Sequence, residues 1–111
     1  MAEPDPLPDP LLDPLQSLFA VIQERQRNPQ PESYTCKLLA GGDNRILKKI
    51  GEEAVEFVMA CKDREQGAIA AEAADVLYHL LVALAHCGTD LDLVYAELAA
   101  RRREKPKDAL K

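Results

Sequence analysis

The 111-residue sequence predicts an all-α fold, an antiparallel helical bundle of about four helices. Three observations predict this class. No useful stretch alternates between apolar and polar residues with the period of two that marks a β-strand. The chain has no Trp, two Phe and three Tyr, so its core must be built mainly from Leu, Ile, Val and Ala, a composition that favours helices. Apolar residues instead recur at helical spacing between clear stop signals.

The chain begins with a segment that cannot be helical. Residues 1–12 carry four prolines at alternate positions and are expected to form a Pro-rich disordered tail. A first helix should follow, because Asp13 can cap it, Pro14 suits its first position and Gln16 completes a capping box. This helix should end near Arg27, before Asn28 and two prolines. Its apolar face would carry Leu15, Leu18, Phe19 and Ile22.

Two longer helices are expected next. Residues 32–43 have a mixed pattern, in which Ser33, Tyr34 and Thr35 look loop-like and Gly41 and Gly42 form a break. A second helix should therefore start near Asp43 or Asn44 and run to about Lys62. A polar connection, 63–67, leads to a third helix from about Ala68 to Cys87, which Gly88 would terminate. The short connection makes the second and third helices an antiparallel pair.

A fourth helix should begin after Thr89 as its cap and end before Pro106. Its apolar residues are Leu91, Val94, Tyr95 and Leu98. Residues 106–111 are expected to be a flexible C-terminus, which leaves 13–105 as a single all-α domain.

Composition excludes several functional classes. The formal net charge of −5 disfavours nucleic acid as a partner. Three widely spaced cysteines without a CxxC pair indicate neither a zinc knuckle nor a disulfide framework. The longest apolar run, 76–85, is too short to cross a bilayer, and the N-terminus lacks the pattern of an export signal. We therefore expect a cytoplasmic protein with no membrane association.

The second helix places carboxylates beside its buried face. At about 100° per residue, Ile46, Ile50, Phe57 and Cys61 share one arc and define the apolar stripe. Glu53 lies at the edge of this stripe. Glu56 is about one step further round, beside Lys49, and Glu52 is more exposed.

The third helix repeats this arrangement on a more apolar background, with Glu72, Asp75, His79 and His86 in one narrow strip. Two antiparallel helices that each carry a carboxylate pair at i and i+3 can bring four acidic groups together. Unpaired, these groups would repel one another and pay a desolvation cost, which a hard cation such as Mg²⁺ removes. The alternative, that each pair only belongs to a solvated helix face, stays open on this evidence.

Two sequence motifs carry a family resemblance. "GEEAVE", 51–56, followed by "EAAD", 72–75, resembles the E-E-x-x-E … E-x-x-D pattern of the all-α, MazG-type nucleotide pyrophosphohydrolases. The additional segments 33–35 (Ser-Tyr-Thr), 48–51 (Lys-Lys-Ile-Gly) and 77–81 (Leu-Tyr-His-Leu-Leu) resemble the phosphoribosyl-ATP pyrophosphatase family. The resemblance covers about residues 15–103.

The resemblance implies an activity. Members of this family use Mg²⁺ to hydrolyse N1-(5-phosphoribosyl)-ATP to phosphoribosyl-AMP and pyrophosphate, the second step of histidine biosynthesis. It also implies a homo-oligomer, at least a dimer, with sites at the subunit interface. By match to the motif, the metal ligands would be Glu53, Glu56, Glu72 and Asp75. Catalytic roles would fall to Glu52, Glu53 and Glu56.

A polyanionic substrate also needs binding groups, because the protein itself is acidic. The candidates are Arg45 and, in addition, Ser33, Tyr34, Thr35, Lys37, Lys48, Lys49 and His79. Each has an ordinary alternative. The lysines can be solvated, the tyrosine can pack its loop instead of stacking on a purine, and the histidine can be a buried group bonded to a neighbour. For His79, a buried group bonded to a neighbour is the preferred interpretation.

Two other functions remain to be separated from this one. A related pyrophosphatase that clears non-canonical nucleoside triphosphates would share the acidic motif, although the 33–35 segment argues against it. A non-enzymatic helical dimerisation module would use the polar strip as a buried interface network.

Overall fold

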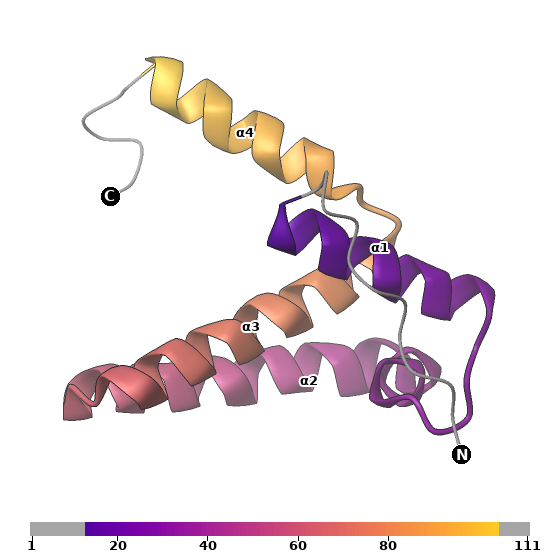
Figure 1. The fold of residues 1–111 in the computed structure, drawn as a ribbon, viewed down its shortest axis with the longest axis horizontal. Helices are drawn as coiled ribbons and strands as arrows, with labels where there is room; N and C mark the ends of the chain where they lie inside the picture. Colours follow the sequence, from indigo (N-terminus) through magenta and orange to yellow (C-terminus); the bar gives the residue numbers. More distant parts are fainter. Residues whose placement is uncertain (1–12, 105–111) are drawn as a thin grey trace.

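The computed structural model describes residues 13–104, and it contains four helices (Figure 1). They are α1 (Pro14–Arg27), α2 (Tyr34–Asp63), α3 (Gln66–Cys87) and α4 (Leu91–Glu104). No strand occurs within 13–104, so the predicted all-α class is confirmed. The predicted tail, 1–12, and the predicted flexible C-terminus, 106–111, lie outside the described residues.

Helix α1 starts with the predicted capping box. The Asp13 side chain accepts a hydrogen bond from the Gln16 backbone N–H at 2.8 Å, and the Gln16 side chain accepts one from the Asp13 N–H at 3.3 Å. These contacts satisfy two of the N–H groups that a helix start leaves without a partner. The expected apolar face is also found, since Phe19 and Ile22 are buried.

Helix α2 begins at Tyr34, well before the expected start. The predicted start near Asp43 or Asn44 is wrong, and so is the loop-like interpretation of Tyr34 and Thr35, because Ser33 acts as an N-cap for the Cys36 N–H and Leu38 is fully buried in the core. The predicted break is present at Gly42, which has φ +67° and ψ −160°, a conformation that favours glycine. A short first segment, 34–41, therefore meets a long second segment, 43–63, at a kink.

Helices α2 and α3 form the antiparallel pair that the sequence predicts (Figure 1). Between them Arg64 adopts a left-handed conformation, and the Glu65 carboxylate accepts hydrogen bonds from the first N–H groups of α3. Helix α3 ends at Gly88, which has φ +72° and provides the expected C-terminal cap.

The last helix, α4, leaves the bundle at an angle (Figure 1). Asp90 rather than Thr89 stands at its start, where the Asp90 side chain accepts a hydrogen bond from the Asp92 N–H at 3.0 Å. Leu91 at its first position is buried, whereas Leu93 and Leu98 further along are exposed. Only the beginning of α4 thus belongs to the core of this chain.

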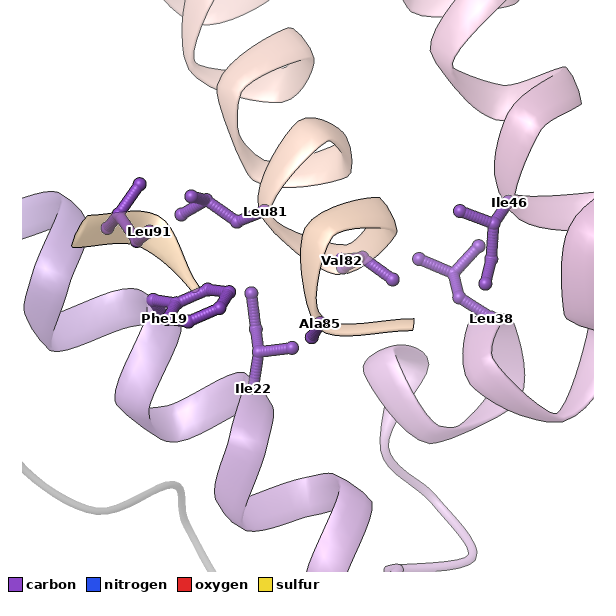
Figure 2. Packing of buried hydrophobic residues seen from close by; sticks show 8 residues of the cluster. All are labelled: Phe19, Ile22, Leu38, Ile46, Leu81, Val82, Ala85 and Leu91. Carbon is purple, nitrogen blue, oxygen red and sulfur yellow. The ribbon is translucent and has the colours of Figure 1, made fainter. Parts of the chain in front are cut away.

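The buried core gathers where three helices and the start of α4 meet (Figure 2). Its members are Phe19, Ile22, Leu38, Ile46, Leu81, Val82, Ala85 and Leu91. The part of the α2–α3 pair that lies away from this core is covered on one side only. Its outward faces expose Val55, Val58, Met59, Leu77 and Leu80.

By length and composition, α3 is the one helix within 13–104 that could cross a membrane. This is weak evidence, because the core helices of bundles pass the same test. Glu72, Asp75 and His79 lie in the middle of this helix, where ionisable groups are costly in hydrocarbon. These ionisable groups therefore argue against a membrane span.

Candidate acidic metal site

Three carboxylates from the two long helices come together. Glu53 and Glu56 lie one turn apart on α2, and Glu72 lies on the facing part of α3. One oxygen of each carboxylate lies within 4.8 Å of the others. The antiparallel α2–α3 pair thus converts two sequence motifs into one acidic cluster, the Glu53–Glu56–Glu72 cluster.

The cluster contains buried acceptors that the chain leaves unpaired. Glu53 is 8% exposed, and its Oε2 atom accepts no hydrogen bond from the residues described. The same holds for Oε2 of Glu72. Buried carboxylate oxygens nearly always have a partner, because desolvating them without one is costly. A cation held between the two helices would give both oxygens a partner.

Lys49 supplies part of the compensating charge. Its ammonium group lies 3.2 Å from Glu53 Oε1 and 3.6 Å from Glu52 Oε1. The hydrogen bond to Glu53 raises the pKa of Lys49 above its usual value, so this amine stays charged. One ammonium group cannot neutralise three carboxylates. It also contacts Oε1 of Glu53, whereas the oxygen without a partner is Oε2.

The two carboxylates of α2 titrate in opposite directions. The contact with Glu56 is the main cause that lowers the pKa of Glu53, and Lys49 lowers it further. The same contact, together with the charges of Glu53 and Glu72, raises the pKa of Glu56. As pH falls without a cation, Glu56 therefore binds a proton before Glu53 does.

The donor set fits a hard divalent cation. Mg²⁺ binds oxygen ligands at about 2.0–2.1 Å in octahedral geometry, so two of its ligands lie at most about 4.2 Å apart. Separations of up to 4.8 Å need only small side-chain rotations to reach this geometry. All three donors are carboxylates, which hard cations prefer to soft metals. The exposed side of Glu56 leaves room for water and for a phosphate oxygen.

Two other predicted acidic residues stand beside the cluster. Glu52 is exposed and faces Lys49. Asp75 lies one helical turn beyond Glu72 and is exposed, and its carboxylate is outside the group of three that the structure brings together. The structure thus assembles three of the four expected ligands.

An aromatic group borders the cluster. The Tyr34 hydroxyl lies 3.2 Å from Nε2 of His79, whose Nδ1 lies 2.7 Å from the backbone oxygen of Asp75. The Tyr34 ring is stacked on Tyr78, with centroids 6.1 Å apart and an interplanar angle of 27°. The Tyr78 hydroxyl is hydrogen-bonded to Thr35 Oγ1. The preferred interpretation of His79 as a buried, bonded histidine is confirmed, since it is 4% exposed.

The remaining candidates divide into structural and exposed groups. Ser33 caps α2, and Thr35 holds Tyr78, so both hydroxyls have internal partners. Lys37 and Lys48 are exposed. His86 does not join the cluster that its helical position suggested, because its Nε2 lies 2.6 Å from an Asp43 carboxylate oxygen.

One member of the aromatic group has no motif that predicts its role. Tyr78 belongs to the segment 77–81, but its pairing with Thr35 depends on the first segment of α2 being helical. The sequence does contain a signal for this helical segment, because Ser33 stands three residues before Cys36, as an N-cap would. The neighbouring polar residues obscure this pattern.

Comparison with known proteins agrees with this geometry. Residues 15–102 match the family described as phosphoribosyl-ATP pyrophosphohydrolase. Similar proteins include the histidine biosynthesis bifunctional protein HisIE of Synechocystis sp., 64% identical over 89 residues, and that of Nostoc sp., 61% identical over 89 residues. In both cases the match covers 80% of this chain and 41% of the relative, so the chain spans about two fifths of the length of these relatives. The chain belongs to the phosphoribosyl-ATP pyrophosphohydrolase family.

Proposed function

We propose that this protein hydrolyses the α–β phosphoanhydride of N1-(5-phosphoribosyl)-ATP in a Mg²⁺-dependent reaction, the second step of histidine biosynthesis. The products are phosphoribosyl-AMP and pyrophosphate. The observation that carries this proposal is the pair of buried, unpartnered oxygens, Glu53 Oε2 and Glu72 Oε2, on two facing helices. Family membership identifies the nucleotide, and these oxygens indicate how a polyanion can bind to an acidic protein.

In this proposal Glu53, Glu56 and Glu72 hold Mg²⁺, and Asp75 joins them by a rotation of its exposed side chain. When bound, the cation neutralises charge on the phosphate oxygens and polarises the phosphorus centre. Glu56, whose pKa is raised by its contact with Glu53 and by the charges of Glu53 and Glu72, would hold the cation in its ionised form, because ligand carboxylates must be ionised.

The residues around the cluster complete the reaction. A water oxygen forms a bond to phosphorus, the α–β bridging bond breaks, and the bridging oxygen leaves with pyrophosphate. Glu52 is exposed beside the cluster and is the residue that we assign to orienting this water and accepting its proton. Lys49 holds Glu53 in place through the 3.2 Å contact, and therefore fixes a ligand rather than the substrate.

The exposed cations Lys37 and Lys48 are proposed to contact substrate phosphates. Ser33 and Thr35 act indirectly, because their hydroxyls hold the first segment of α2 in place. We also propose that the protein is a cytoplasmic homodimer or higher homo-oligomer. The exposed apolar residues Val55, Val58 and Leu77 support this, because an isolated chain gains nothing from presenting them to water.

The test is pyrophosphate release from phosphoribosyl-ATP with and without Mg²⁺. Glu53→Gln and Asp75→Asn should each abolish release while circular dichroism shows intact helices, because the neutral isosteres preserve shape and remove charge. Glu97→Gln, on the exposed surface of α4, is the matched control and should retain activity. Full activity of both Glu53→Gln and Asp75→Asn would remove the metal-site assignment. Faster hydrolysis of dCTP, dUTP or ITP would show that the substrate is a different nucleotide.

A further inference from the structure

We propose that the Tyr34 ring is the surface on which the base of the bound nucleotide stacks, and that buried His79 is the positioning residue that fixes this ring. The inference deepens the proposed function, since it rests on a nucleotide binding at the Glu53–Glu56–Glu72 cluster. It also replaces the sequence-based hypothesis of direct contact between His79 and the substrate, because His79 is 4% exposed.

The hydrogen bonds of His79 define its role. A backbone carbonyl can only accept, so Nδ1 must donate its proton to the Asp75 oxygen at 2.7 Å. In the neutral imidazole Nε2 is then an acceptor, and it receives the Tyr34 hydroxyl at 3.2 Å. His79 therefore anchors the far end of the Tyr34 side chain to the body of α3.

Two further contacts hold the Tyr34 ring. Tyr78 backs one face at a centroid distance of 6.1 Å, and the His79 ring meets Tyr34 edge-on at 6.0 Å and 82°. Thr35 in turn fixes the hydroxyl of Tyr78. Tyr34 nevertheless remains 45% exposed. An exposed aromatic ring that is held at its tip and on one face is already ordered for binding, so a ligand that stacks on it pays little entropy.

The position of the ring explains which ligand group it meets. The Tyr34 hydroxyl is bonded to His79, and His79 is bonded to the backbone oxygen of Asp75, which lies one turn after Glu72 on α3. The ring thus borders the place where phosphates would be held. Phosphate recognition uses charge and hydrogen bonds and gains nothing from an aromatic face. A flat π-bearing group attached to the phosphates, the nucleobase, is the part that an aromatic wall recognises.

Binding of Mg²⁺-α,β-methylene-ATP and of Mg²⁺-pyrophosphate, measured by calorimetry, tests the stacking. Base–aromatic stacking is worth on the order of ten-fold or more in affinity, so Tyr34→Ala should weaken nucleotide binding by about that factor and leave pyrophosphate binding unchanged. Tyr34→Phe keeps the ring and should lose less. Tyr95→Phe, which removes a tyrosine hydroxyl bonded to Asp13, is the matched control and should bind as wild type does.

Two results would overturn the stacking proposal. One is unchanged nucleotide affinity in Tyr34→Ala, and the other is an equal loss for nucleotide and pyrophosphate. Sedimentation of the same samples shows whether the substitution acts on assembly instead. If wild-type protein binds the nucleotide analogue through Tyr34 but does not hydrolyse phosphoribosyl-ATP, the proposed function fails and this inference stands.

A matched pair of variants tests the positioning role. In His79→Gln the amide oxygen reaches the place of Nε2 and can accept from Tyr34, whereas in His79→Asn the amide reaches only the place of Nδ1. His79→Gln should therefore bind the nucleotide analogue more tightly than His79→Asn. In the Tyr34→Phe background this difference should vanish, because no hydroxyl remains to be anchored. Equal affinities of the two variants, or a difference that persists in the Tyr34→Phe background, would overturn the role of His79.

Discussion

Lys49 and Glu53 form a contact that uses only half of the carboxylate. The Lys49 ammonium lies 3.2 Å from Glu53 Oε1, while Oε2 of the same group is buried without a hydrogen-bond partner in the described chain. The contact with Glu56 and then that with Lys49 lower the pKa of Glu53, and the lysine orients its carboxylate. The other oxygen is left for a ligand, which explains why a helix that must bury an apolar face carries a carboxylate at the edge of that face.

Glu72→Gln should remove the response of thermal stability to Mg²⁺. A ligand at about 100 times its dissociation constant stabilises the native state by about 2.7 kcal/mol, so Mg²⁺ should raise the melting temperature of the wild type by several degrees. The variant lacks one ligand and should show no such rise. Its melting temperature without metal should equal or exceed that of the wild type, because a buried unpartnered charge has been neutralised.

Differential scanning calorimetry with and without Mg²⁺ measures both effects. Glu97→Gln changes an exposed i, i+4 pair and controls for the loss of one negative charge. If Glu72→Gln gained as much from Mg²⁺ as the wild type does, the cation would bind elsewhere.

The stability of the metal-free protein should depend on pH through Glu56. Its pKa is raised above the ordinary value of 4.5 because Glu53 and Glu72 lie beside it. A raised pKa contributes stability that is present below pH 4.5 and is lost as pH rises through the folded-state pKa. The lowered pKa of Glu53 acts in the opposite sense, and its contribution is lost as pH falls below its ordinary value of 4.5.

Melting curves between about pH 4.5 and pH 7 check this prediction. The wild type without metal should lose stability relative to Glu56→Gln as pH rises through this window, because only the wild type must ionise Glu56 beside two other carboxylates. With Mg²⁺ present the stabilisation by metal should grow over the same window, since carboxylates bind the cation only when they are ionised. Parallel curves for the two proteins without metal would contradict the assigned contact.

The sequence was sufficient to predict the helix ends whose signals are local. Asp13 and Gln16 predicted the start of α1, and Gly88 predicted the end of α3, because each acts through hydrogen bonds within one turn. The helical periods also predicted that Glu53, Glu56, Glu72 and Asp75 would converge from facing edges, and the structure brings the first three of these together. Whether their oxygens lie within 4.8 Å depends on the packing of the pair, which no local pattern encodes.

The first segment of α2 escapes prediction from sequence for a tertiary reason. Polar residues and two glycines indicate a loop, but burial of Leu38 against α1 and α3 stabilises a helix there. The contact between Tyr34 and His79 spans 45 positions in the sequence and exists only because this segment is helical. The aromatic border of the site could not be predicted for that reason.

The exposed face of α2 should mediate self-association. Val58 is 55% exposed in the single chain, beside exposed Val55 and Met59. Val58→Glu should convert the proposed oligomer to a monomer, because a buried unpaired charge in an interface is costly. Ala20→Glu adds the same charge to the exposed surface of α1 and should leave assembly unchanged. Sedimentation velocity measures the assembly of both variants. If the wild type were a monomer and Val58→Glu had no effect, this face would not mediate self-association.

Gly42→Ala should destabilise the protein and loosen the Tyr34 segment. Gly42 has φ +67° and ψ −160°, a region that residues with a Cβ atom occupy at a cost of about 1–3 kcal/mol. Gly51→Ala is the matched control, since Gly51 lies within regular α2 and an added Cβ would meet nothing within 4 Å. That change should stabilise the protein by about 0.5–1 kcal/mol through helix propensity. Urea unfolding gives both values, and an equal or greater stability of Gly42→Ala would mean that α2 continues through this position without the kink that orients Tyr34 toward His79.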